Sequence, residues 1–125
     1  MQVSLFWAAA IMSIVTFSVH TFIGGPRVAA PLLDNSSLPK ASKWLNYYCW
    51  HITTIYTLFM GTAYAYVALH PDRPELVIFL TVLNAALSIL SVVVARKGGI
   101  NPFRFPSTSL FAVVSILGFW GLLTG

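Results

Sequence analysis

Hydrophobic residues form four long stretches of the chain, and every charged side chain lies between them. The stretches cover about 3–23, 44–69, 76–95 and 107–123. A helix of ~20 residues crosses the roughly 30 Å hydrocarbon core of a bilayer. Because a backbone in lipid must satisfy its own hydrogen bonds, each stretch is predicted to be a transmembrane helix. The predicted fold is all-α, a membrane-embedded four-helix bundle forming a single domain over 1–125.

Glycine and proline residues mark the predicted ends of these helices. The Gly-Gly-Pro run at 24–26 predicts the end of the first helix, and the Gly/Pro-rich run at 98–106 predicts the third loop. The apolar segment 27–33 is predicted to belong to the first loop and to lie at the membrane interface. The link at 71–75 is so short that the second and third helices are predicted to be antiparallel neighbours.

The distribution of Lys and Arg predicts the orientation. Six of the seven basic residues lie in the first and third loops, and only Arg73 lies in the second. Since basic loops stay in the cytoplasm, we expect these two loops inside and both termini outside. The predicted location is therefore a bacterial cytoplasmic (inner) membrane. The partners expected are the lipid bilayer and other membrane subunits or a second copy of the chain, and not nucleic acid.

Composition excludes several classes of protein. The chain is 58% hydrophobic and 8% charged, whereas soluble domains carry roughly 25% charged residues. The single cysteine, Cys49, excludes an intrachain disulfide, a cysteine-based zinc site and a CxxC redox motif. There is no P-loop string, and no carboxylate lies within a span to drive proton-coupled antiport.

Polar and small residues recur at helical spacing in three of the spans, which predicts one packing face for each helix. Asn84, near the midplane, is expected to form an interhelical hydrogen bond, with a pore or substrate role as the alternative. The predicted polar core consists of Thr16, Asn84, Ser88, Ser91 and Ser115. The full stripes are Ala9, Ser13, Thr16 and His20; Thr81, Asn84, Ser88, Ser91 and Ala95; and Ala112, Ser115, Gly118 and Gly121.

The second span differs, because its polar residues surround much of its circumference. This distribution predicts that it is the central helix of the bundle. Its aromatic residues suit the belts at the two membrane interfaces, with a ligand-binding role as the alternative. They are Trp44, Tyr47, Tyr48, Trp50, Tyr64 and Tyr66.

Two histidines are the candidate functional residues. His20 and His51 are both predicted to lie near the cytoplasmic ends of their helices, so they share a leaflet and are expected to lie close together. Two imidazoles facing each other could bind haem, hold a metal ion or relay a proton. The alternative is that each bonds a hydroxyl or a loop carbonyl at the wet end of the bundle.

The run His20-Thr21-Phe22-Ile23-Gly24-Gly25-Pro26, followed by Cys49-Trp50-His51, resembles a pattern of uncharacterised small bacterial four-helix integral membrane proteins. The resemblance covers both histidines and the span layout. It implies the four-span architecture, and it implies no activity.

Three functions are compatible with these observations. The leading hypothesis is a non-enzymatic accessory or assembly subunit of a larger inner-membrane complex, for which an energy-transducing complex is one candidate. The second is a haem- or metal-binding redox protein that uses His20 and His51 as ligands. The third is a small oligomeric transporter or channel.

Overall fold

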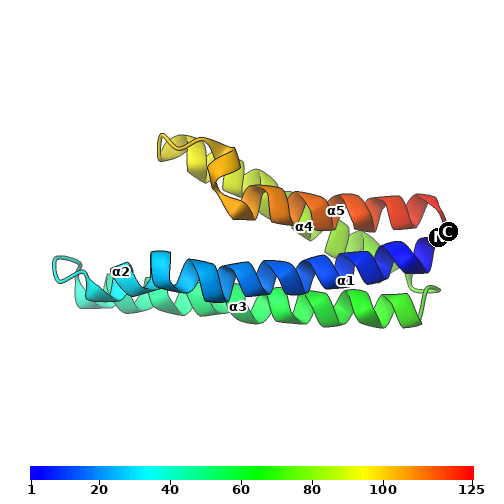
Figure 1. Ribbon diagram of the computed structural model, residues 1–125, viewed down its shortest axis with the longest axis horizontal. Coiled ribbons are helices and arrows are strands. Elements are labelled where there is room, and N and C mark those ends of the chain that lie inside the picture. Colours follow the sequence, from blue (N-terminus) through cyan, green and yellow to red (C-terminus); the bar gives the residue numbers. More distant parts are fainter.

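The computed structural model covers residues 1–125 and contains helices and turns without strands, which confirms the all-α prediction. Four helical stretches are long and apolar enough to cross a membrane. They are Gln2–Asp34, α3 (Lys40–Leu69), α4 (Pro74–Lys97) and α5 (Pro106–Leu123), and a single 3-10 turn, η2 (Pro102–Arg104), precedes α5 (Figure 1).

The first helical stretch is longer than the sequence predicts. α1 (Gln2–Ser18) continues through a π-helical segment, η1 (Val19–Ala29), into α2 (Ala30–Asp34) without a break. The prediction that 24–26 ends the helix is wrong, and 27–33 is helix rather than loop. Pro26 has no N–H to donate to a carbonyl four residues earlier. The wider π-helix carries the chain past this point, and the Ala30 N–H then bonds the carbonyl of Gly25, five residues back.

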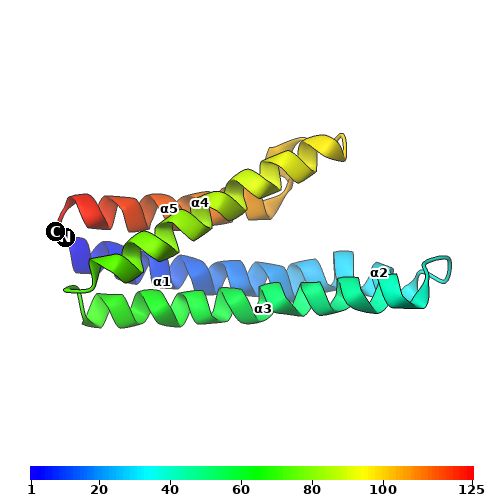
Figure 2. The ribbon, with the colours of Figure 1, turned by 180° about the vertical axis from the view of Figure 1, so that it is seen from behind.

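The four helices form two hairpins. α1 packs along α3, α4 packs along α5, and the hairpins meet mainly through α1 and α5 (Figures 1 and 2). α3 and α4 are antiparallel, but they diverge from their common turn and contact each other little (Figure 2). The predicted antiparallel arrangement is confirmed, but the two helices are neighbours only near their common turn.

The inner helices are α1, which lies between α3 and α5, and α5, which lies between α1 and α4, so the prediction of a central second span is wrong. The polar residues of α3 do not require neighbouring helices, because several bond their own backbone. The Thr54 and Thr57 hydroxyls donate to the Trp50 and Thr53 carbonyls, at 3.2 and 2.9 Å. The outer face of α3 is apolar, with Ile55 59% exposed.

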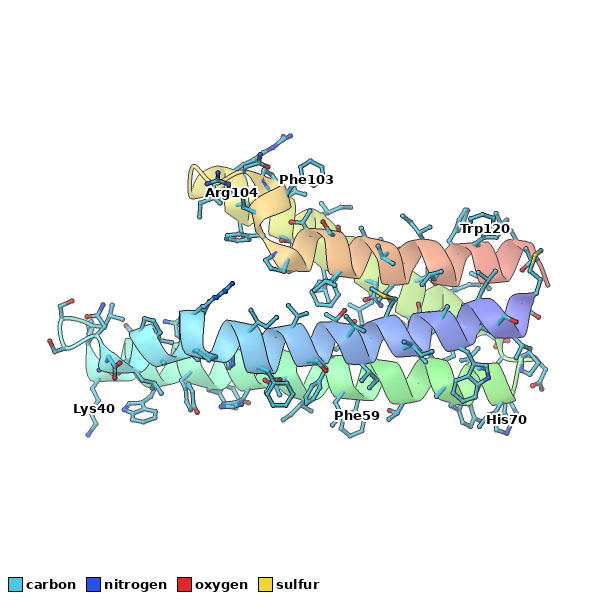
Figure 3. The ribbon with its side chains drawn as sticks, viewed as in Figure 1. Lys40, Phe59, His70, Phe103, Arg104 and Trp120 are labelled. Atoms are coloured by element: carbon cyan, nitrogen blue, oxygen red, sulfur yellow. The ribbon has the colours of Figure 1, made fainter.

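Both termini and the turn at 70–73 lie at one end of the molecule, and the loops at 35–39 and 98–101 lie at the other (Figures 1 and 2). Lys40 and Arg104 accordingly lie at the opposite end from His70 and Trp120 (Figure 3). We call the end with the loops at 35–39 and 98–101 the basic end. The direction in which it faces across a membrane stays a prediction.

The packed core lies toward the termini, and this position leaves the basic end open. Phe6 of α1 meets Gly121 of α5, and Ile14 of α1 meets Gly61 of α3, so glycines permit close helix contact at both crossings. The buried cluster consists of Phe6, Ala9, Ala10, Met60, Tyr64, Val67, Ala68, Val77, Leu80, Phe111 and Val114. The hairpins diverge from this cluster toward the basic end (Figure 1).

Candidate functional site

The polar stripe of α1 lies inside the bundle. Ser13 and Thr16 are buried, and their hydroxyls donate to the carbonyls of Ala9 and Met12 in the same helix, each at 2.8 Å. These two hydroxyls are therefore satisfied without a partner helix. Burying these hydroxyls costs little free energy, because each one is hydrogen-bonded to a carbonyl one turn earlier in its own helix.

The polar stripe of α4 instead joins α4 to α5. The Ser88 hydroxyl donates to the Thr108 carbonyl at 2.8 Å, and the Ser115 hydroxyl donates to the Thr81 carbonyl at 3.0 Å. The Ser91 Oγ lies 2.8 Å from the Ser107 Oγ and 2.7 Å from the Thr108 Oγ1. Bonds between hydroxyls and carbonyls of adjacent transmembrane helices stabilise their association. The Ser88 and Ser91 bonds hold the α4–α5 hairpin together near the basic end, and the Ser115 bond does so near the middle of α5.

Asn84 is fully buried, but it does not form the expected interhelical bond. Its Nδ2 donates to the Leu80 carbonyl in α4 at 2.7 Å, and its Oδ1 has no hydrogen-bond donor. The prediction of a bond to another helix is therefore wrong. Short polar side chains in helices often bond a carbonyl one turn earlier in this way.

His20 lies at the crossing of η1 and α3, and its partner is Trp50. The two rings are stacked with centroids 3.9 Å apart, and the His20 Nε2 lies 3.1 Å from the Trp50 carbonyl oxygen. Gly24, one turn further along η1, makes room for this indole, since a Cβ there would lie 2.8 Å from the Trp50 ring. His20, Gly24 and Trp50 thus form one interlocked contact between the two helices.

His51 has different surroundings from His20. It is exposed on α3, and its ring packs edge-on against Tyr47 with centroids 4.5 Å apart. No hydrogen bond or ring stacking joins the two imidazoles, and no group of three or more His, Cys, Asp or Glu side chains is placed to hold a metal ion. The haem hypothesis stays a prediction. An absorption spectrum tests it, since a Soret band should vanish in both His20→Ala and His51→Ala.

A cleft of about 430 Å³ lies between the two hairpins at the basic end. One wall comes from α1, η1 and α3 and includes His20 and Trp50, and the other comes from η2 and α5. The lining combines charged, polar and apolar side chains. These are Thr16, Val19, His20, Ile23, Gly24, Arg27, Val28, Trp50, Thr53, Thr57, Arg104, Phe105, Pro106, Ser107, Leu110 and Phe111.

The charges that line the cleft are all positive. Arg27 comes from η1 and Arg104 from η2, and neither forms an ion pair. The chain's one ion pair joins Arg73 to Asp72 at the other end of the molecule. The amino-terminal end of α5 also borders the cleft, and its capping residue, Phe105, supplies no side-chain cap. A helix amino terminus adds partial positive charge, so the cleft as a whole favours anions.

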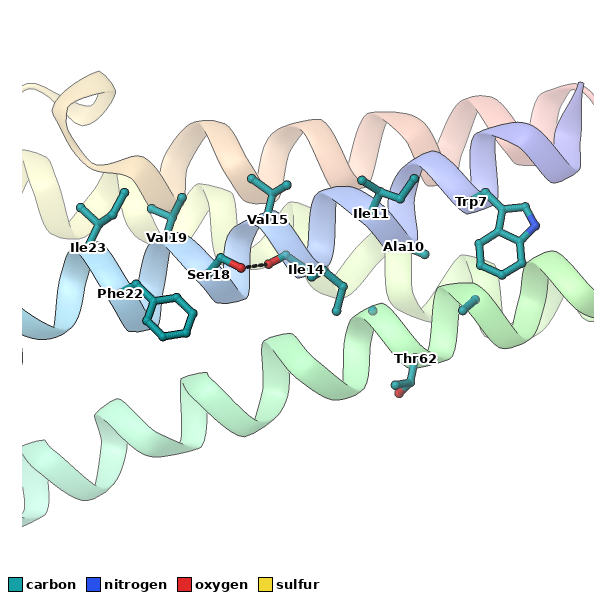
Figure 4. A pocket seen from close by; sticks show the side chains of 12 residues that line it. Trp7, Ala10, Ile11, Ile14, Val15, Ser18, Val19, Phe22, Ile23 and Thr62 are labelled. Carbon is teal, nitrogen blue, oxygen red and sulfur yellow. Dashed lines mark hydrogen bonds between the residues drawn. The ribbon is translucent and has the colours of Figure 1, made fainter.

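A second concavity, a groove of about 600 Å³, runs between α1 and α3 (Figure 4). Its lining is mostly apolar, and it includes the small residues Ala10, Ser18, Gly61, Thr62 and Ala65. Trp7 and Phe22 lie toward its two ends (Figure 4). We call this concavity the α1–α3 groove.

Sequence reasoning named His20 but missed the cleft's two arginines, which it used only to predict orientation. The signal for Arg27 was the spacing Thr16, His20, Gly24, Arg27, which continues the polar stripe of α1 at helical intervals. Because a Gly-Gly-Pro run predicts a helix end, the predicted stripe stops at His20. Nothing in the sequence indicates that Arg104 lies on the wall of the cleft opposite Arg27.

No protein-family model matches the chain, and no match was found among curated proteins or among solved structures.

Proposed function

We propose that the chain is a non-enzymatic integral membrane protein that serves as an accessory or assembly subunit of a larger membrane complex. The α1–α3 groove carries this proposal, because it is an apolar concavity on the outer surface of the bundle, with the smaller residues Ser18, Thr62 and Ala65 among larger ones such as Trp7 and Phe22. Transmembrane helices associate where small side chains let two backbones approach closely. A transmembrane helix of another subunit is the occupant that this surface fits best.

The hydroxyls in the groove support the same occupant. Ser18 donates to the Ile14 carbonyl and Thr62 to the Phe59 carbonyl, each at 2.8 Å (Figure 4 shows the first). Because these donors are already satisfied, an apolar helix can cover them without leaving a polar group unpaired. The groove then requires shape complementarity from its partner and no matching polar group.

The proposed setting is a bacterial cytoplasmic membrane with both termini outside. Its support is the clustering of six Lys and Arg residues in and beside the two loops of the basic end, with Arg73 alone at the other end. The length of the helices agrees, since α4 has 24 residues and α5 has 18. At ~1.5 Å per residue these are roughly the lengths that a bilayer requires.

Site-specific photocrosslinking in native membranes tests the proposal. A photoreactive residue at Thr62, inside the groove, should give one discrete adduct with a different membrane protein. The same residue at Ile55, which is exposed on α3 but outside the groove, is the matched control and should label lipid only. Thr62→Phe should abolish copurification of that partner, whereas Ile55→Phe should leave it unchanged.

Two outcomes would overturn the accessory role. Labelling of lipid alone at Thr62 would mean that the groove has no protein partner. An adduct between two copies of this chain would instead favour the oligomeric transporter or channel. A measurement of oligomeric mass in detergent separates these two results.

A further inference from the structure

We propose that the cleft between the hairpins binds a membrane amphiphile with an anionic phosphate head, such as an anionic phospholipid. In this arrangement Arg27 and Arg104 hold the head group, and the apolar walls take the first part of an alkyl chain. The rest of the lipid extends from the cleft into the bilayer. This site is separate from the α1–α3 groove, and its test does not depend on a protein partner.

The head-group assignment rests on the unpaired positive charges. Arg27 and Arg104 stand on different hairpins and line one cleft, and none of the three acidic residues of the chain lines it. Two like charges on facing walls repel each other, and an anion between them removes that cost. The guanidinium group is suited to phosphate, because its planar donors can form two parallel hydrogen bonds.

The amino-terminal end of α5 also favours an anion at this position. Its first turn contains Pro106 and Ser107, both of which line the cleft, and no side chain caps it. The Ser107 hydroxyl is already engaged with Ser91, so it does not cap the helix. Pro106 has no N–H and the Thr108 N–H bonds the Phe105 carbonyl at 3.0 Å, so Ser107 is the cleft-lining residue of this turn whose N–H remains for a phosphate oxygen. This donor supplements the two arginines.

The apolar half of the lining distinguishes a lipid from free phosphate. Val19, Ile23 and Val28 on one wall lie opposite Leu110 and Phe111 on the other. At about 430 Å³ the cleft falls within the range of roughly 300–1,000 Å³ typical of ligand pockets. Inorganic phosphate would leave these apolar walls uncovered, whereas an alkyl chain would bury them.

The position of the cleft along the membrane normal matches that of a phospholipid head group. α5 spans about 27 Å over its 18 residues, close to the hydrocarbon thickness, and the cleft opens beside its first turn. In a membrane that α5 crosses, this turn lies at the level of the phospholipid phosphates. Basic pockets between transmembrane helices at this level are suited to anionic head groups.

Ligand-dependent thermal unfolding of the full chain in a neutral detergent tests the proposal. Dioctanoyl phosphatidylglycerol should raise the unfolding temperature, because a ligand that binds the folded state stabilises it. Dioctanoyl phosphatidylcholine and inorganic phosphate should each have little effect. In Arg27→Gln/Arg104→Gln the half-saturating concentration of phosphatidylglycerol should rise by at least about tenfold, since each arginine loses charge-assisted hydrogen bonds.

The matched control is Arg96→Gln/Lys97→Gln, which removes the same charge at the basic end outside the cleft lining. This variant should bind phosphatidylglycerol as the unaltered chain does. Equal weakening in the two double variants would overturn the site. Equal stabilisation by phosphatidylcholine would overturn the head-group assignment, and equal stabilisation by inorganic phosphate would overturn the lipid assignment.

A second measurement leaves the arginines in place and therefore does not depend on their variants folding. Phosphatidylglycerol with brominated chains quenches nearby tryptophans, and Trp50 lines the cleft. Saturable quenching in the unaltered chain should be lost in Trp50→Phe, although Trp7, Trp44 and Trp120 remain. Quenching that persists unchanged in Trp50→Phe would mean that the lipid binds elsewhere.

Discussion

At the residue scale, Asn84 shows that burial and hydrogen bonding are separate properties. The side chain is 0% exposed, yet its Oδ1 lacks a donor and its Nδ2 is bonded within its own helix. An unpaired buried acceptor costs roughly 1–3 kcal/mol. We therefore expect Asn84 to weaken the bundle, whereas Ser115, whose hydroxyl bonds the Thr81 carbonyl, joins two helices.

We expect Asn84→Val to raise the free energy of unfolding by up to about 1 kcal/mol, because the unpaired oxygen disappears while most of the space stays filled. Ser115→Ala, which removes an interhelical bond, should lower it by about 0.6 kcal/mol. Denaturant unfolding of both variants in detergent measures the two effects. A loss of stability in Asn84→Val would contradict the expectation that the Asn84 side chain weakens the bundle.

The candidate site was predictable from sequence only in part. The spacing of Thr16 and His20 indicates an inward face, and the structure places Thr16 in the core and His20 at its edge. The partner of His20 was not predictable, because Trp50 lies 30 residues away and its contact depends on how α3 is rotated against η1. Helix periodicity gives a side chain's direction and does not identify what lies opposite it.

At the element scale, the glycines of α5 determine how closely it packs. A Cβ at Gly118 would collide with Thr81 Oγ1 of α4 and the Tyr64 hydroxyl of α3, and one at Gly121 would collide with the Phe6 ring of α1. The stripe of small residues at 112, 115, 118 and 121 is visible in the sequence, and it predicts that this helix packs closely against another helix. The sequence did not indicate that this stripe meets three different helices.

Gly118→Ala should lower the free energy of unfolding by about 1–3 kcal/mol, since the packed core has no room for a methyl group there. Gly25→Ala is the control, because nothing lies within 4 Å of its added Cβ. That substitution should leave stability unchanged or slightly raised. Thermal unfolding in detergent compares the two, and similar losses would contradict the packing of α5.

The Gly-Gly-Pro run shows why the ends of elements are harder to predict than their existence. Such a run usually ends a helix, because proline lacks a donor and glycine is flexible. Here the chain widens into a π-helix and continues to Asp34. Gly24 also admits the Trp50 ring, a tertiary contact that local sequence rules do not include.

At the scale of the whole molecule, charge and hydrophobicity predict how many helices there are and which ends lie together. They do not predict which helices pair. In lipid every helix is apolar on its outside, so pairing depends on shape and on a few hydrogen bonds. The short turn at 70–73 makes α3 and α4 antiparallel. However, α4 packs along α5, to which the Ser88 and Ser91 hydroxyls are hydrogen-bonded.

The orientation across the membrane is open to a direct test. A reporter that is active only outside the cytoplasm, fused after Gly125, should be active, because the basic end is expected to remain in the cytoplasm. Fusion within the loop at 98–101 provides the internal control and should be inactive. Activity of a cytoplasm-only reporter after Gly125 would reverse the orientation.

The weak contact between α3 and α4 suggests that the 70–73 turn is not needed to hold the folded molecule together. Fragments 1–72 and 73–125 each contain a complete hairpin, and their shared surface is mainly that between α1 and α5. Expressed together as separate chains, they should reassemble and copurify. Gly121→Leu should prevent this, because Phe6 fills that space, whereas the exposed substitution Phe119→Leu should not. The two hairpins are then the halves of a split protein, and the α1–α5 interface is the main surface that joins them.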